Sequence, residues 1–271
     1  AAFPQKGRSG PRMKTAFALG RMGKYLASTL RTTPALEGLS EESSFTELMY
    51  RVITGKKGFD TDKGKLIEAM SVASVDHGVT PPSAQVAILS ATTRVDYAVS
   101  VASGIGAITD VHGGAGRKAA LFFSQCVSRS RKENIDLAEA TNREVTDYIR
   151  AGRRIEGLGH RIHTQDPRRD VLWKLSEAAG IAAENVTVSK IVSDVFKQVR
   201  GMNLPINVDG VIGAIVADMG LDPVIAKALF IWGRLAGLSA HYFEEILSQP
   251  EMRPINFAQA VYNGKPQREL L

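Results

Sequence analysis

Three segments of this 271-residue chain gather side chains that transfer protons and bind anions. Gly159-His160-Arg161 precedes Asp166-Pro167-Arg168, and Asn207-Val208-Asp209-Gly210 begins about fifty residues after the first. Imidazole and carboxyl groups serve as general acids and bases, and guanidinium groups bind carboxylates. The three segments therefore predict carbonyl chemistry on an anionic substrate.

Two more histidines lie upstream, each beside a glycine. One is in Val75-Asp76-His77-Gly78, and the other is in Val111-His112-Gly113-Gly114-Ala115. A lone histidine is more often a hydrogen-bonded structural residue than a catalytic one, so its neighbours decide the interpretation. Beside the segments above, these two histidines favour a catalytic set.

The arginines support this interpretation. Arg161 and Arg168 flank the His160 loop, whereas Arg234 lies in the otherwise apolar segment Trp232-Gly233-Arg234-Leu235-Ala236-Gly237. A charge in such a segment is costly without a partner. Guanidinium groups bind carboxylates in bidentate fashion, so this cluster predicts a di- or tricarboxylate ligand. A buried ion pair between helices is the alternative for Arg234.

Asp209 lies between Val208 and the apolar run Gly210-Val211-Ile212. Burial in such a setting raises the pKa of a carboxyl group and makes it suited to exchange a proton with carbon. The alternative is a structural role as a helix N-cap.

Other chemistries are less well supported. Gly104-x-Gly106 lacks the third glycine of a dinucleotide fingerprint, and the chain has no P-loop. His112-Gly113-Gly114 resembles an esterase oxyanion loop, but no GxSxG segment accompanies it. The histidines show no metal-binding spacing, although a site built from His77, His112 and His160 stays geometrically open. We therefore expect acid–base chemistry with no metal and no tightly bound cofactor.

The composition is that of an ordinary globular protein, with 44% hydrophobic residues. The net charge of +6 is spread along the chain, which favours a small polyanion over nucleic acid as the ligand. The single cysteine, Cys126, lies in an apolar helical context and is expected in the core. One cysteine fits a reducing compartment, and no secretory signal or membrane-spanning run is visible. We expect a soluble, cytoplasmic protein that binds neither nucleic acid nor membrane.

Helical patterns recur along the chain, and strand-like alternation does not, which predicts an all-α fold. Ser44-x-x-Glu47 fits a capping box before a helix over 45–54 that Gly55 ends. Asp166-Pro167 and Asp222-Pro223 fit the N-cap and first position of two more helices. Further helices are expected at 63–75, 83–103, 114–131, 137–151, 186–200 and 211–219. Residues 1–12 are expected to form a flexible basic tail.

Taken together, the motifs resemble the citrate synthase superfamily, and within it the stand-alone citryl-CoA lyases and the C-terminal lyase module of ATP citrate lyase. The resemblance runs from about residue 40 to the end of the chain, and the set is specific although each motif alone is weak. The residues that carry it are Ser44-Phe45-x-Glu47, Asp76-His77-Gly78, His112-Gly113-Gly114-Ala115, Gly157-Leu158-Gly159-His160-Arg161, Asp166-Pro167-Arg168, Asn207-Val208-Asp209-Gly210, Gly233-Arg234-x-x-Gly237 and His241-Tyr242.

The resemblance implies a large helical domain, a smaller one that closes over the active site, and a homodimer or homotetramer. The small domain would span 117–207, and the large domain would combine 1–116 with 208–271. Full citrate synthases are longer at the N-terminus, so the start of this chain is more similar to the lyase module. The chain has no ATP-grasp or phosphohistidine region, so a complete ATP citrate lyase is not expected.

The resemblance also implies catalytic roles in the cleavage of citryl-CoA to acetyl-CoA and oxaloacetate. His160 would accept the proton of the tertiary hydroxyl and stabilise the emerging carbonyl. His112 would hydrogen-bond the thioester oxygen of the acetyl-CoA enolate, and Asp209 would deliver the proton to carbon. Coenzyme A would enter as a thioester substrate or product, not as a bound cofactor.

Ligand-binding positions follow in the same way. The carboxylates of oxaloacetate or the citryl group would be held by His77, Arg168 and Arg234. Arg253 resembles an arginine that reaches into the neighbouring subunit's site, and Arg161 occupies a variable position that contacts CoA or an acyl carboxylate. The CoA thioester would lie along Gly157, Leu158 and Gly159, with Arg153 or Arg154 near its phosphates.

His112 leaves the fate of the thioester open. The lyase module of ATP citrate lyase lacks a histidine at this position, whereas citrate synthases have one that could assist thioester hydrolysis. The leading expectation is a citryl-CoA lyase, or a relative that cleaves another carboxylated 3-hydroxyacyl-CoA. The alternative is a short citrate or methylcitrate synthase. A non-catalytic subunit of the same fold is less favoured, because His160, His112 and Asp209 are all present.

Overall fold

The structure is a computed structural model that describes residues 44–46, 49, 61–159 and 166–253. Within these ranges the chain forms helices and isolated bridges but no β-strand, which confirms the all-α prediction. None of the helices described is both long and apolar enough to cross a membrane. The helices are α5 (Thr61–Val72), α6 (Pro82–Ala91), α7 (Tyr97–Gly106), α8 (Ala115–Glu133), α9 (Leu137–Arg150), α10 (Pro167–Ala178), α11 (Glu184–Arg200), α12 (Val208–Asp218) and α13 (Val224–Ser248).

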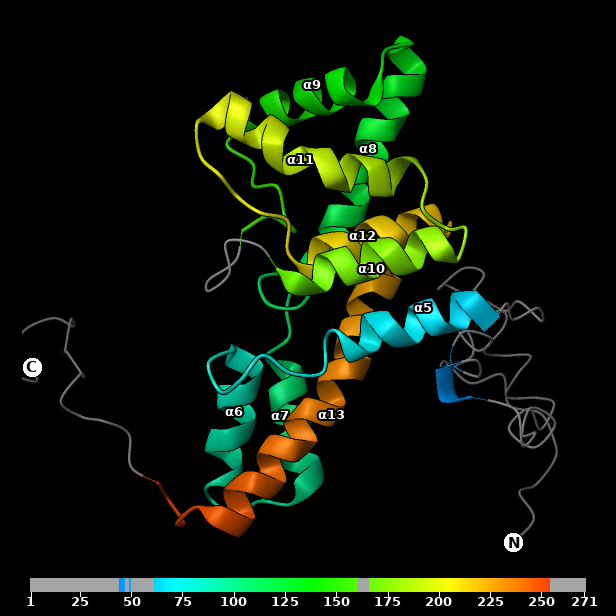
Figure 1. Cartoon of the computed structure of the whole chain (residues 1–271). Coiled ribbons are helices and arrows are strands. Elements are labelled where there is room, and N and C mark those ends of the chain that lie inside the picture. Colours follow the sequence, from blue (N-terminus) through cyan, green and yellow to red (C-terminus); the bar gives the residue numbers. More distant parts are fainter. Residues whose placement is uncertain (1–43, 47–48, 50–60, 160–165, 254–271) are drawn as a thin grey trace, which may run out of the picture.

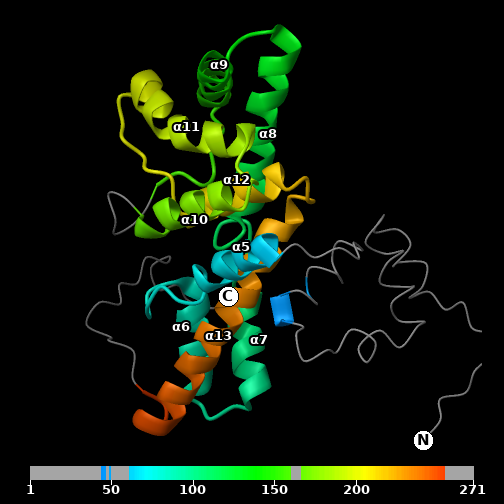
Figure 2. The same cartoon turned by 45° about the vertical axis from the view of Figure 1, so that its right-hand side comes forward.

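The helices form two groups that α13 connects (Figure 1). Helices α6 and α7 pack against each other and against the C-terminal half of α13, at the lower end of the molecule as drawn. Helices α8, α9, α11 and α12 pack together at the upper end, with α10 against α12. Helix α5 crosses α13 near its middle, and the rotated view shows the same arrangement (Figure 2). The level where α5, α10, α12 and α13 meet is where the candidate site lies.

The larger apolar core lies in the upper group. Helix α12 is buried almost along its whole length, from Val208 to Val216, and packs most extensively against α8. Phe122, Phe123 and Cys126 of α8 contribute to the same core. Burial raises the pKa of the Cys126 thiol to about 12, so this residue is an inert core side chain as expected. A smaller core of Ala87, Val101 and Leu238 joins α6, α7 and α13.

The predicted single helix over 83–103 is wrong, because the chain turns between α6 and α7. Arg94 adopts a left-handed conformation with φ of 60°, which ends the helical path. Asp96 then acts as the N-cap of α7, accepting a hydrogen bond from the Ala98 N–H at 2.9 Å. The turn contains no glycine or proline, so the sequence offered no strong breaker.

The remaining helices agree closely with the predictions. Asp166 caps α10 as expected, whereas α13 begins at Val224, one residue later than predicted, with the Asp222 carboxylate accepting from the Val224 N–H. Helix α5 ends at Val72 rather than at residue 75, and α12 begins at Val208 rather than at 211. Glu47 and most of the predicted 45–54 helix lie outside the described residues, as does the 1–12 tail.

Candidate active site

Arg234 is the buried charge around which the candidate site is built. Its side chain is 2% exposed, in the middle of α13. The guanidinium donates from Nε to the Ser74 carbonyl at 3.0 Å and from Nη1 to the Ser83 hydroxyl at 3.3 Å. It also lies 4.7 Å above the ring of Phe230. Burial lowers the pKa of Arg234, and the nearby carboxylates of Asp76 and Asp209 act in the opposite direction.

Two glycines explain how the chain reaches Arg234. A Cβ atom on Gly233 would lie 2.0 Å from the Ser71 carbonyl oxygen, and one on Gly237 would lie 2.0 Å from that of Val75. The end of α5 and the loop after it therefore rest directly on the backbone of α13. This close approach accounts for the Gly233-Arg234-x-x-Gly237 motif, because it brings the carbonyl acceptor for Arg234 against the helix.

His112 is oriented by Ser83, on the first turn of α6. The Ser83 hydroxyl oxygen is 2.8 Å from Nε2 of His112, and the Ser83 backbone N–H points at the same nitrogen at 3.4 Å. The imidazole stands edge-on to the Phe230 ring at 6.0 Å. Gly113 has φ of +74°, and a Cβ there would lie 2.4 Å from that ring, so only glycine fits. Ser83 thus connects His112 with Arg234.

Asp166 is a fully buried carboxylate that joins two helix starts to Arg168. The Arg168 guanidinium binds it in bidentate fashion, with Nε and Nη2 donating at 2.9 and 2.8 Å. Asp166 also accepts from the backbone N–H groups of Arg168 and of Val208, at the starts of α10 and α12. The Nη1 group of Arg168 reaches the Ala73 carbonyl at 2.9 Å. Arg168 therefore spans from α10 to the end of α5.

The glycine loop that precedes His160 is fixed to the start of α12. The Gly159 N–H donates to the Pro205 carbonyl at 2.7 Å, and the Asn207 N–H donates to the Gly157 carbonyl at 2.9 Å. A Cβ on Gly157 would lie 2.6 Å from Cα of Gly210. This contact requires glycine and sets the loop against the first turn of α12, beside Asp209. His160 and Arg161 follow directly but lie outside the described residues.

Asp209 lies in the first turn of α12, where Asn207 rather than Asp209 is the N-cap. The alternative of a capping role for Asp209 is therefore wrong. Burial raises the pKa of Asp209 from 3.8 to about 6. The charges of Arg168 and Arg234 lower this pKa, and those of Asp166 and Glu156 raise it. A carboxyl group with this pKa is available in both protonation states near neutral pH, as proton transfer requires.

His77 lies in a turn that Asp76 closes. The Asp76 carboxylate accepts from the Gly78 N–H at 3.0 Å and from Nε2 of His241 at 2.9 Å. Burial opposes ionisation of Asp76, but the hydrogen bonds from His241, Gly78 and the His77 N–H lower its pKa overall. Asp76 is thus an anion on the same side of α13 as Arg234.

The predicted site residues thus fall into three groups. In the first, Asp209 interacts with Arg168 and Arg234, and Ser83 joins Arg234 to His112. His77 follows Asp76, whose charge acts on Arg234, and the loop from Gly157 to Gly159 lies against the start of α12. The second comprises Arg153 and Arg253, each held elsewhere. Arg153 is exposed and stacks on the Tyr148 ring at 3.7 Å. Arg253 lies past the C-terminal end of α13, bound in bidentate fashion to the buried Glu245 at 3.0 Å. His160 and Arg161 are the third group, outside the described ranges.

Sequence reasoning missed four residues of this region as site residues. Ser83 and Phe230 position His112 and Arg234, and His241 holds the turn of His77 through Asp76. Asp76 and His241 belonged to conspicuous motifs but received no role. Ser83 follows two prolines at a helix start and gives no sequence signal, because its partners are distant in the chain.

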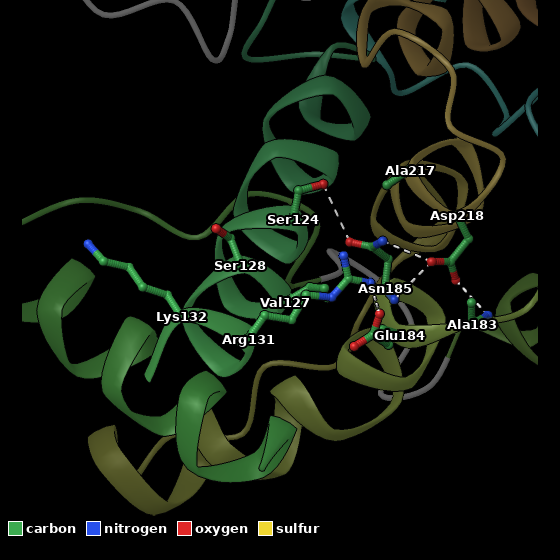
Figure 3. A pocket seen from close by; sticks show the side chains of 10 residues that line it. All are labelled: Ser124, Val127, Ser128, Arg131, Lys132, Ala183, Glu184, Asn185, Ala217 and Asp218. Carbon is green, nitrogen blue, oxygen red and sulfur yellow. Dashed lines mark hydrogen bonds and ion pairs between the residues drawn. The ribbon is translucent and has the colours of Figure 1, made fainter. Parts of the chain in front are cut away.

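A separate surface hollow lies between α8, α11 and the end of α12 (Figure 3). In this hollow Arg131 pairs with Glu184, and the Asp218 carboxylate accepts from the backbone N–H groups of Ala183 and Asn185. None of the predicted site residues lines it. Within the described ranges, no group of three or more His, Cys, Asp or Glu side chains is arranged to hold a metal ion.

Comparison with known proteins shows what this chain is similar to. Residues 8–255 match the family model of the citrate synthase C-terminal domain. The structure of citryl-CoA lyase from Hydrogenobacter thermophilus is 31% identical with a TM-score of 0.75, over 87% of this chain and 90% of that one. An ATP citrate lyase from Methanosaeta concilii, solved as a variant in complex with (3S)-citryl-CoA, is 23% identical with a TM-score of 0.69, over 82% of this chain and 38% of that one.

Among curated proteins, the citrate synthase of Haloferax volcanii is 29% identical over 199 residues, which is 72% of this chain and 48% of that enzyme. The chain thus spans about half the length of this relative, and it covers 17% of a probable ATP-citrate synthase from Caenorhabditis elegans that is 27% identical. The relatives thus include a citrate synthase, a probable ATP-citrate synthase and a citryl-CoA lyase.

Proposed function

Because this chain belongs to the citrate synthase family, we propose that it cleaves citryl-CoA to acetyl-CoA and oxaloacetate. The observation that carries the proposal is Asp209, a carboxyl group with a pKa of about 6 set beside Arg168 and Arg234. Such a group can give a proton to an enolate carbon while the two cations hold substrate carboxylates. The likeness to citryl-CoA lyase over nearly its whole length supports this assignment.

The proposed reaction moves two protons and breaks one carbon–carbon bond. His160 removes the proton of the tertiary hydroxyl, the carbonyl of oxaloacetate forms, and the electron pair of the breaking bond passes into the acetyl-CoA enolate. Protonated Asp209 then delivers its proton to the enolate carbon and becomes a carboxylate. In the reverse direction the Asp209 carboxylate removes a methyl proton from acetyl-CoA.

The contacts of Ser83 indicate which nitrogen of His112 serves the enolate. Arg234 donates to the Ser83 hydroxyl oxygen, so that hydroxyl can donate in turn to Nε2 of His112. The Ser83 backbone N–H also faces this nitrogen, which favours Nε2 as an acceptor. The ring proton then lies on Nδ1, where it can hydrogen-bond the thioester oxygen and stabilise the developing negative charge. We propose Nδ1–H as that donor.

Substrate binding follows from the same cluster. We propose that Arg168, Arg234 and His77 bind the carboxylates of oxaloacetate or of the citryl group. Each guanidinium group has five N–H donors, and only some of them donate to protein acceptors. The others are available to a substrate carboxylate. The CoA thioester would lie along the loop from Gly157 to Gly159, with Arg153 and Arg161 on its path. CoA takes part as the thioester of the substrate and of the product in this scheme, and the proposed steps use acid–base chemistry of the side chains alone.

The alternative function is that of a short citrate or methylcitrate synthase. The observation that favours it is His112, held close to the region of the thioester, together with curated relatives that are citrate synthases. In that case the same carbon–carbon step would run toward condensation, and hydrolysis of the thioester would follow.

We further propose a homodimer or homotetramer in the cytoplasm. Exposed apolar side chains on α6 and α7, among them Val86, Leu89 and Val99, support a second copy at the lower end of the molecule. We retain 117–207 as the small domain, which would close on the ligand. Arg253 would then serve the partner's site by exchanging Glu245 for a ligand carboxylate.

The experiment that tests the function is to supply citryl-CoA to the purified protein and identify the products by mass spectrometry. Acetyl-CoA and oxaloacetate are the expected products. Citrate and free CoA would favour the synthase instead. If citryl-CoA is not consumed, and acetyl-CoA and oxaloacetate do not condense, both functions are contradicted.

A further inference from the structure

A carboxylate–imidazole pair fastens the turn of His77 to α13. Asp76 and His241 are 165 residues apart in sequence, yet Nε2 of His241 donates to Oδ1 of Asp76 at 2.9 Å. His241 is 8% exposed, so this hydrogen bond is shielded from water on the imidazole side. Its Nδ1 lies 4.0 Å from Glu244. Charge-assisted hydrogen bonds of this kind are among the stronger ones in proteins.

The pair continues a stripe of contacts along one face of α13. Gly233 and Gly237 admit the carbonyls of Ser71 and Val75, and His241 follows one turn further along the helix. The chain therefore lies on α13 up to Val75, and the next residue, Asp76, is the one that His241 binds. Backbone contacts with Gly233 and Gly237 thus fix the chain from Ser71 to Val75, and the His241 hydrogen bond fixes Asp76, which follows.

The other oxygen of Asp76 determines the shape of the turn. Oδ2 accepts from the Gly78 N–H at 3.0 Å, and the His77 N–H also hydrogen-bonds the carboxylate. Gly78 has φ of +74°, a left-handed conformation that favours glycine directly after His77. His77 is thus enclosed between two residues whose positions depend on the Asp76 carboxylate. Rotation of that carboxylate would rotate the backbone that carries His77.

We propose that His241 is a positioning residue for the carboxylate-binding site, acting through Asp76 on the orientation of His77. The inference rests on the proposed function, in which His77 binds a substrate carboxylate. His241 does not itself touch the substrate in this scheme. It holds the Asp76 carboxylate, whose hydrogen bonds define the turn. In metal and catalytic sites, residues behind the ligand-binding side chains orient those side chains in the same way.

The same pair has a second effect, on Arg234. Burial lowers the pKa of Arg234, and the negative charge of Asp76 raises it. The hydrogen bond from His241 lowers the pKa of Asp76 and so keeps that carboxylate ionised. Loss of His241 would therefore weaken two carboxylate-binding groups, His77 and Arg234. The CoA side of the site, along the loop from Gly157 to Gly159, would be unaffected because its contacts go to Pro205 and Asn207. This difference separates a positioning role from a general effect on folding.

The test compares His241→Gln with His241→Leu. Glutamine retains an N–H donor that can reach Asp76, whereas leucine fills the space without a donor. Isothermal calorimetry with oxaloacetate and, separately, with CoA measures the two halves of the site without requiring turnover. We expect His241→Leu to weaken oxaloacetate binding by about tenfold or more, since small misplacements of binding groups have effects of this size. His241→Gln is expected within about threefold of wild type, and CoA binding should be unchanged in both.

A double-mutant cycle with His77→Ala makes the test specific. If His241 acts through His77, the change His241→Leu should weaken oxaloacetate binding much less in the His77→Ala background. Equal effects in both backgrounds, or unchanged oxaloacetate binding in a folded His241→Leu protein, would overturn the inference. If His241→Leu does not fold, His241→Gln is compared with Asp76→Asn, which removes the charge of the acceptor. Equal oxaloacetate affinities of these two variants would then overturn the inference. If wild type binds neither oxaloacetate nor CoA, the proposed function itself fails.

Discussion

The two ends of α12 each carry an aspartate, and their surroundings differ completely. Asp218, in the last turn, accepts hydrogen bonds from the backbone N–H groups of Ala183, Asn185 and Val186 and from the Asn185 amide. It caps α11 and borders the surface hollow (Figure 3). Asp209, in the first turn, is desolvated among charges and has its pKa raised to about 6. Asp218 is thus engaged by donors that hold the start of α11, whereas burial leaves Asp209 able to take up a proton.

The largest expected difference between these ends is catalytic. Asp209→Asn removes the group that exchanges a proton with carbon, so kcat should fall by about a hundred- to ten-thousand-fold. Oxaloacetate binding should change little, because Arg168 and Arg234 remain. Steady-state kinetics and calorimetry measure the two quantities. Asp218→Asn is the matched control at the other end of the helix, and a similar loss of kcat there would remove the distinction.

The support beneath the site can be broken at Gly237. A Cβ there would collide with the Val75 carbonyl, so Gly237→Ala should lower the free energy of unfolding by about 3 kcal/mol through overpacking. Gly106→Ala is the control, because a Cβ at Gly106 would meet no atom within 4 Å. Denaturant unfolding compares the two. Equal stability of both variants would contradict the close packing of the loop on α13.

The first turn of α12 should also make stability depend on pH through Asp209. Because the pKa of Asp209 is raised in the folded state, its contribution to stability is present below pH 4 and is lost as the pH rises through about 6. The shift corresponds to at most about 3 kcal/mol. Asp209→Asn should therefore be more stable relative to wild type at pH 7.5 than at pH 4. Thermal or urea unfolding at the two pH values gives the difference, and equal relative stabilities at both pH values would contradict a raised pKa of Asp209.

The smallest expected effect concerns Ser83. Ser83→Ala removes the hydroxyl between Arg234 and His112 but leaves the backbone N–H that faces Nε2. We expect kcat to fall by about tenfold, because the imidazole is oriented less firmly. Ser124→Ala, at the hollow, is the control, since the Ser124 hydroxyl donates to the Asn185 side chain across that surface and lies away from the candidate site. An unchanged kcat in Ser83→Ala would argue against His112 as the donor to the enolate.

The parts of the molecule that depend on local sequence were predictable. Asp166 with Pro167 predicted the start of α10, and the apolar run after Asp209 predicted both burial and a raised pKa. The break between α6 and α7 was not predictable in this way, because Arg94 adopts a left-handed conformation without glycine or proline nearby. Boundaries of that kind depend on tertiary contacts, here between Arg94 and the end of α13.

Candidate site residues could be proposed from the sequence, but their arrangement could not. His77, His112, Arg168, Asp209 and Arg234 stood out by type and by their glycine or apolar neighbours. Their supports did not, because Ser83 contacts Arg234 across 151 residues and Asp76 contacts His241 across 165. Hydrogen bonds over such separations leave no periodic pattern in a single sequence. The structure supplies these supports, and through them the reason for the Gly233-Arg234-x-x-Gly237 motif.

The most direct test of Asp209 is exchange of the acetyl-CoA methyl protons in heavy water. With oxaloacetate bound, wild type should introduce deuterium into the methyl group, which mass spectrometry detects whether the thioester is later hydrolysed or kept. Asp218→Asn should exchange at the wild-type rate, and Asp209→Asn should not exchange measurably. Wild-type exchange by the Asp209→Asn protein would contradict the assignment of Asp209 as the group that moves a proton to and from carbon.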